Sequence, residues 1–238
     1  MTRAYNEDEM LRQLAQDLWV AERPQRAFGI EMGTRMTVVR LADGTLFVHS
    51  PVALDRATRL ALDALGPVRH VVAPNRFHHL HAGVYPVVYL DARFYAAPGV
   101  GEKRPDLPID EVLGDTAPSV WAGQIDQTLF RGMPLTNEIV FLHRTTRTLV
   151  LTDIATNVRA APGLDTWLLF SVNGTYGRFA AGWIERLLTR DWGAARASLE
   201  HVLAWDFDRI IVAHGDVVDN GGPAALRTAF DWLLSAHR

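Results

Sequence analysis

An apolar strand runs directly into a histidine cluster in the stretch Val68-Arg69-His70-Val71-Val72-Ala73-Pro74-Asn75-Arg76-Phe77-His78-His79-Leu80-His81. Residues 68–73 have the length and the valine content of a buried strand, and Pro74 ends it. In layered α/β folds, the side chains that follow the carboxyl ends of strands share one crevice, where ligands bind. Because three of the nine histidines fall within residues 78–81, the stretch predicts both such a fold and a site.

Strand and helix patterns surround this stretch. Asp43-Gly44 lies between apolar runs and predicts a hairpin turn, and Gly66-Pro67 predicts the end of a helix. Within 91–135, several prolines and glycines predict loops and short helices, with one strand in 121–130. The remaining predicted elements are strands at 28–32, 36–41, 45–49, 138–143, 148–153 and 209–213, the last of them central, and helices at 55–65, 176–189, 194–204 and 223–235.

Two more apolar strands end in polar residues. Residues 149–151 run into Thr152-Asp153, and residues 210–213 run into His214-Gly215-Asp216. Imidazole and carboxylate are ligands that Zn²⁺, Fe²⁺ and Mn²⁺ accept, and the chain has no cysteine to replace them. The sequence therefore predicts one shared site at these strand ends. Its candidate metal ligands are His78, His79, His81, Asp153 and His214.

Composition narrows the class of protein. The 238 residues are 48% hydrophobic and 21% charged, with a formal net charge of −3, which is typical of a globular protein with a sizeable core. Scattered charges, without a basic stretch, predict neither a nucleic-acid nor a membrane partner. The N-terminus lacks the apolar core of a signal peptide. We expect a cytoplasmic protein with one domain over residues 1–238, in which 1–17 are an N-terminal extension.

The order of these landmarks resembles the metallo-β-lactamase superfamily, over most of the chain from about Trp19. Phrases such as His49-Ser50-Pro51, residues 138–141, residues 147–153 and Trp205-Asp206-Phe207-Asp208 resemble a divergent branch of it. The resemblance implies an α/β fold, a four-layer αββα sandwich, with one or two metal ions at an edge of the two sheets.

The family motif His-x-His-x-Asp-His corresponds here to residues 74–79. Its first two histidines are replaced by Pro74 and Arg76, neither of which binds a metal ion, and the next histidine ligand would fall near Pro134. The resemblance thus implies that the first metal position is lost. The second is partly kept: His78 replaces the aspartate, and His79, Asp153 and His214 match the remaining ligands, with His81 as an extra histidine.

Three further residues are candidates for positioning or substrate binding. His49 ends a strand where the family often has an aspartate. Arg76 would pair with Asp153 and fill the first position, or would bind an anionic group of the substrate. Asp216 would orient an imidazole or cap a helix.

Two functions remain open from the sequence. The first is a metal-dependent hydrolase of a small ester, lactone, amide or phosphoester, with one divalent Zn, Fe or Mn ion and with Asp153 and His79 as catalytic residues. The second is a metal-free pseudoenzyme or small-molecule-binding protein, which the residues at 74, 76 and 134 favour. In both cases we expect the protein to bind a small molecule and to be a monomer or a homodimer.

Overall fold

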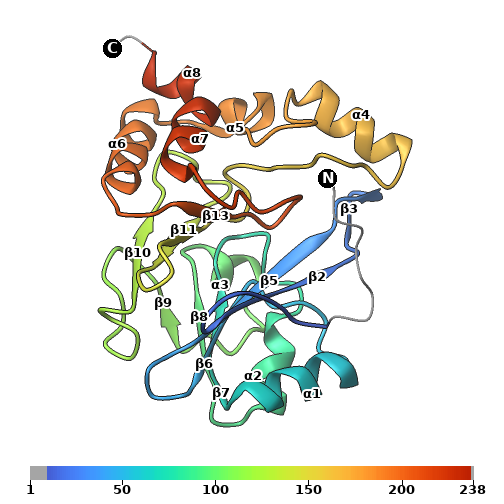
Figure 1. The fold of residues 1–238 in the computed structure, drawn as a ribbon, viewed down its shortest axis with the longest axis vertical. Coiled ribbons are helices and arrows are strands. Elements are labelled where there is room, and N and C mark those ends of the chain that lie inside the picture. Colours follow the sequence, from blue (N-terminus) through green and yellow to red (C-terminus); the bar gives the residue numbers. More distant parts are fainter. Residues whose placement is uncertain (1–9, 237–238) are drawn as a thin grey trace.

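The computed structural model describes residues 10–236. A large sheet has the strand order β1-β2-β5-β6-β7-β8-β9, and a smaller one has the order β10-β11-β12-β13 (Figure 1). The strands of the large sheet are β1 (Arg12–Ala15), β2 (Leu18–Arg23), β5 (Thr34–Arg40), β6 (Leu46–His49), β7 (Val68–Ala73), β8 (Arg93–Ala96) and β9 (Glu111–Val112). Those of the smaller sheet are β10 (Ile125–Leu129), β11 (Ile139–His143), β12 (Thr148–Val150) and β13 (Arg209–Ile211).

The two sheets pack face to face, and helices cover their outer faces. One buried cluster joins Val48 and Val71 of the large sheet to Phe141 of the smaller sheet. The helices are α1 (Arg56–Leu65), α2 (Tyr85–Val88), α3 (Val100–Lys103), α4 (Leu164–Val172), α5 (Trp183–Leu188), α6 (Trp192–Leu203), α7 (Gly222–Ala229) and α8 (Asp231–Leu234), with a 3₁₀ turn at Ala82–Val84. The four-layer αββα sandwich expected from the sequence is confirmed.

Aromatic side chains fill the space between the sheets. Phe47 contacts Trp121 and Phe141 edge to face, with ring centroids 5.0 Å and 5.6 Å apart. A second cluster lies between the smaller sheet and the helices α6–α8, where Leu149 and Ile210 pack with Phe230. Each fully buried side chain of this kind stabilises the fold by about 1.5–3 kcal/mol, so the two clusters hold the sheets, and therefore the strand ends, in fixed relative positions.

Parallel pairing decides which strand ends meet. β6, β7 and β8 run parallel, as do β12 and β13. In the second pair Val150 is opposite Ile211. Asp153 and His214 each lie three residues beyond these partners, so the register places them side by side. The 74–76 segment, which follows β7, joins the smaller sheet through Ile139 N–H to Pro74 O and Arg76 N–H to Thr136 O.

Most predicted elements are present, and several differ in extent. In place of the expected strand at 28–32, the chain forms a hairpin of two short strands, β3 (Arg26–Ala27) and β4 (Ile30–Glu31). Phe28 and Gly29 form its turn, since their φ angles are 52° and 81°. β13 is the last strand of its sheet, not a central one. The helix expected at 176–189 begins at Trp183, and the closing helix is interrupted between α7 and α8.

Several elements were not predicted, among them β8 and β9, which lie within 91–135 where loops and short helices were expected. Residues 12–15, inside the expected N-terminal extension, form β1 at the edge of the large sheet. β2, next to it, and α4 were also missed. Residues 1–9 of the extension lie outside the described residues.

Candidate metal centre

Three of the five candidate ligands converge at the edge of the two sheets. His78 follows β7, Asp153 follows β12, and His214 follows β13; one ligand atom of each lies within 4.8 Å of the others. His78 Nε2 is 3.3 Å from Asp153 Oδ1, and His214 Nε2 is 3.2 Å from the same oxygen. The exposed fractions of the three side chains are 9%, 20% and 8%. The site is thus recessed, and its carboxylate is the most accessible part.

The tautomer of His214 follows from its second contact. Its Nδ1 lies 2.9 Å from the carbonyl oxygen of Gly33, and because a carbonyl only accepts hydrogen bonds, Nδ1 must carry a proton. If the imidazole is neutral, Nε2 then carries a lone pair and is a hydrogen-bond acceptor. It faces an oxygen of Asp153 that is also an acceptor. Two acceptors at this distance repel each other unless a cation or an added proton lies between them. The donor set therefore fits a metal ion.

Ser50 holds the second imidazole. Its Oγ lies 2.7 Å from His78 Nδ1. Ser50 is buried and has a φ of 53°, a left-handed conformation that is uncommon outside glycine. Such strain persists only where the surroundings impose it. A hydroxyl on Nδ1 leaves Nε2 of His78 directed at Asp153, which is how proteins commonly orient a metal-binding histidine.

Asn75 and Glu138 fix the carboxylate. The side-chain amide of the buried Asn75 donates to Asp153 Oδ2 at 2.6 Å. Its oxygen accepts from the backbone N–H groups of Phe77 and His78, each at 2.8 Å. The fully buried Glu138 accepts from the N–H groups of residues 152, 153 and 154, at 2.7, 2.7 and 3.2 Å. One amide and one carboxylate thus set the positions of Asp153 and His78 together.

Charges inside the site shift its pKa values. Burial alone would raise the pKa of Asp153, but the imidazoles of His78 and His214 outweigh it and hold that pKa well below its usual value. Burial would lower the pKa of His78, but attraction to Asp153 outweighs it and raises that pKa. Burial and the charge of Asp153 raise the pKa of Glu138. Asp153 is therefore ionised and available as a ligand at neutral pH.

His79 and His81 lie outside this cluster. His79 Nδ1 is 3.4 Å from the guanidinium of Arg104, and its buried Nε2 has no hydrogen-bond partner among residues 10–236. Burial, followed by the charges of Lys103 and Arg104, lowers the pKa of His79. His81 Nε2 lies 3.1 Å from Oε1 of Gln25. Of the adjacent histidines, the turn at Asn75 directs His78 to Asp153 and leaves His79 beside cationic side chains.

The other three candidates also lie elsewhere. Arg76 donates to the carbonyl oxygen of Pro134 at 3.1 Å, and Asn75 holds the position beside Asp153 that Arg76 was expected to take. His49 is buried, packs against a phenylalanine, and has no hydrogen-bond partner for either ring nitrogen within the described chain. Asp216 bonds Asn157 through its backbone and lines a neighbouring cleft; among residues 10–236 its carboxylate has no hydrogen bond to an imidazole or to the start of a helix.

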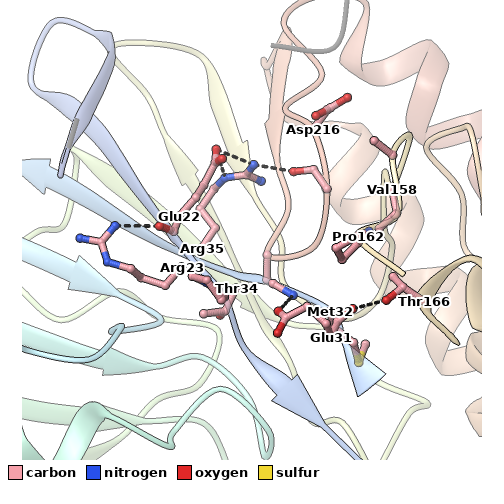
Figure 2. A pocket seen from close by; sticks show the side chains of 15 residues that line it. Glu22, Arg23, Glu31, Met32, Thr34, Arg35, Val158, Pro162, Thr166 and Asp216 are labelled. Atoms are coloured by element: carbon pink, nitrogen blue, oxygen red, sulfur yellow. Dashed lines mark hydrogen bonds and ion pairs between the residues drawn. The ribbon is translucent and has the colours of Figure 1, made fainter. Parts of the chain in front are cut away.

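That cleft, of about 270 Å³, adjoins the His214 loop (Figure 2). Its lining includes Glu31, Thr34 and Arg35 from β4 and β5, and Pro162 and Thr166 from the start of α4 and the segment before it. It is lined as well by residues 213 and 215 on either side of His214, so a molecule bound there lies against the loop that carries this ligand.

Arg35 is the functional residue that sequence reasoning missed most clearly. Its side chain is 4% exposed and donates to the carbonyl oxygens of Val212 and Gly215, which flank His214. Glu22 pairs with it at 2.8 Å, as Figure 2 shows. Because side chains alternate between the two faces of a strand, residue 35 of β5 is expected to share a face with residues 37 and 39. This pattern does not indicate that Arg35 contacts the other sheet. Ser50, Asn75 and Glu138 were missed for the same reason.

The fold is that of the metallo-β-lactamases. It matches the metallo-β-lactamase DIM-1 (TM-score 0.66, 13% identity, covering 95% of this chain and 97% of that one). The metallo-β-lactamase from Pontibacter korlensis matches with a TM-score of 0.64 and 11% identity, covering 95% of this chain and 99% of that one. The metallo-β-lactamase from Erythrobacter litoralis matches with a TM-score of 0.66 and 14% identity, covering 95% of this chain and 96% of that one. Identities this low establish the fold alone. The chain belongs to the family described as "Domain of unknown function (DUF4336)", whose model matches residues 15–165. No curated protein matches the chain.

Proposed function

We propose that this chain is a metal-dependent hydrolase with a mononuclear site formed by His78, Asp153 and His214. The observation that carries the proposal is the facing pair of acceptors, His214 Nε2 and Asp153 Oδ1, 3.2 Å apart, because the other ring nitrogen, Nδ1, donates its N–H to the Gly33 carbonyl. Three protein ligands with one position open to solvent or substrate are typical of catalytic rather than structural metal sites.

A divalent ion held by these three residues would supply Lewis acidity and lower the pKa of a water molecule. The protein's own contribution is positioning. Asp153 brings the negative charge that favours a cation, Asn75 and Glu138 fix its orientation, and Ser50 fixes that of His78. Cleft size favours a small ester, lactone, amide or phosphoester, and the recessed imidazoles limit access by bulk water.

The second candidate is a metal-free small-molecule-binding protein. It is favoured by the same distances, since 3.2–3.3 Å also suits hydrogen bonds from charged imidazoles to Asp153, and the pKa of His78 is raised by that carboxylate despite its burial. In this alternative, protons take the place of the metal ion.

Metal analysis and hydrolysis assays on protein purified without a histidine tag or chelator separate the two. The hydrolase proposal predicts close to one transition metal per chain and activity towards at least one ester, lactone, amide or phosphoester. Both are lost in Asp153→Asn and His214→Gln and retained in His81→Ala, a candidate ligand outside the cluster. Protein that binds no Zn²⁺, Mn²⁺ or Fe²⁺ contradicts it and supports the second candidate.

A further inference from the structure

Helices α4 and α5 expose an unusual amount of apolar side chain. Leu164 and Val172 of α4 are 77% and 70% exposed, and Trp183 and Leu187 of α5 are 64% and 72% exposed. We call these residues, with Leu168 between them, the α4–α5 face. A helix with apolar residues on all sides, as α4 has, is normally buried. Large contiguous apolar patches are rare on monomers and mark surfaces that contact something else.

The face extends over a groove and a hairpin tip. A groove of about 360 Å³ runs between the two helices, lined mainly by Ile30, Leu168, Val172 and Trp183. The β3–β4 hairpin joins α4 through the Thr166 hydroxyl, which donates to the Glu31 carbonyl. At the hairpin tip, Phe28 is 97% exposed. Protruding aromatic and aliphatic side chains therefore come from three separate segments.

The charges around the face are mostly positive. Arg26 lies beside the hairpin tip, donating to Gly29 O. Arg178 donates to the carbonyl of Gly174 at the end of α4, and the Arg186 guanidinium lies 5.2 Å from the Trp183 ring. Of the nearby carboxylates, Asp165 pairs with Arg26 at 4.0 Å, and Glu185 is buried in bonds to Asn173 and Gly182. This positive rim stands out on a chain of net charge −3.

We propose that the α4–α5 face binds the surface of an anionic lipid membrane. Tryptophan is favoured at the boundary between headgroups and acyl chains, leucine and phenylalanine insert below it, and guanidinium groups bind lipid phosphates. The proposed contact is with the membrane surface, since no helix in the described part of the chain is long and apolar enough to span a bilayer. The sequence predicted no membrane partner because its charges are scattered along the chain. The three arginines lie close to these apolar residues only once the chain is folded.

Vesicle sedimentation tests this surface. We expect the protein to sediment with vesicles of phosphatidylcholine and phosphatidylglycerol in equal amounts, and much less with phosphatidylcholine alone. Binding should fall as salt screens the arginines. Val172→Glu should weaken it about tenfold or more, since one buried aliphatic side chain contributes about that factor. Arg178→Gln, which leaves the apolar residues intact, should weaken binding to the anionic vesicles only.

Val87→Glu is the matched control, because Val87 of α2 is also 70% exposed but lies at the opposite end of the molecule from α4 (Figure 1). It should bind like the wild type, and circular dichroism should confirm that all variants fold. Absence of sedimentation with anionic vesicles at low salt overturns the proposal, as does an equal loss in Val172→Glu and Val87→Glu. A wild-type dimer that Val172→Glu dissociates, without vesicle binding, also overturns it and identifies the face as an interface between copies.

Discussion

Replacing Arg35 with methionine should destabilise the protein and release the loop that carries His214. The guanidinium group lies between the two sheets, where it binds the carbonyls of Val212 and Gly215 and the carboxylate of Glu22. Methionine fills a similar volume but donates no hydrogen bond. The substitution would leave two carbonyls without their donor and would remove one of the two arginines that pair with Glu22, since Arg12 also contacts this carboxylate at 3.0 Å.

The size of the effect follows from burial. Removing one partner of a buried ion pair costs about 3–5 kcal/mol. Because the Glu22 side chain is 33% exposed and keeps its ion pair with Arg12, part of that cost is recovered, and we expect the lower end, about 3 kcal/mol. For a chain of this length each kcal/mol lowers the melting temperature by about 2–4 °C, so the shift should be about 6–12 °C.

Urea denaturation followed by circular dichroism measures this loss, and Zn²⁺ titration of the folded variant measures the consequence for His214. Arg35→Lys is the control: it keeps the charge but cannot bind both carbonyls and the carboxylate at once, so it should fall between the wild type and Arg35→Met. A loss below about 1 kcal/mol, the size of an ordinary substitution, or unchanged Zn²⁺ affinity in Arg35→Met would refute the assigned role.

Three further predictions concern the same edge of the sheets. Gly215→Ala should cost more than about 2 kcal/mol, because φ is +93° and the added Cβ would collide with the Asn157 carbonyl; thermal melting measures it. Glu138→Gln should cost about 2 kcal/mol and lower metal affinity, since a neutral amide holds the Asp153 backbone less well than a carboxylate. His49→Leu should flatten the loss of stability in acid: burial lowers the pKa of His49 to about 3 from 6.5. Below pH 6.5 the unfolded chain therefore binds a proton that the native chain does not, at up to about 1.4 kcal/mol per pH unit.

Matched variants make these outcomes decisive. Gly114→Ala meets no atom and has no positive φ, so it should melt like the wild type; equal melting of Gly215→Ala would count against the steric argument. Unchanged metal affinity in Glu138→Gln would show that Asp153 is held by other contacts. For His49, parallel stability–pH curves of wild type and variant between pH 6.5 and 4 would exclude its contribution to acid sensitivity.

Much of the fold could be predicted because its central elements carry strong local signals. β11 is a nearly continuous apolar run, β7 ends in one at Val71-Val72-Ala73, and α1 has an N-cap in Asp55, whose side chain accepts from Thr58 N–H, and a glycine at its end. β2 was missed although four of its residues are buried, since charged residues follow them and the turn before them, at Gln16-Asp17, contains no glycine or proline to mark it. α4 was missed because a helix with apolar residues on all sides and no capping side chain has no clear periodic signal.

The site could be predicted only in part. Asp153 and His214 follow parallel neighbours in equal register, so identifying their strands was enough to bring them together. The choice between His78 and His79 depends on the turn that Asn75 makes by accepting two backbone N–H groups. Contacts over long separations, such as Arg35 with the His214 loop, leave no mark in local sequence. The orienting residues therefore emerged only from the structure.

A crystal of tag-free protein grown with Zn²⁺, with data collected above and below the zinc absorption edge, tests the central claim most directly. We predict one anomalous peak within coordination distance of His78 Nε2, His214 Nε2 and a carboxylate oxygen of Asp153. No peak at this position, with both imidazoles hydrogen-bonded to Asp153, would contradict it.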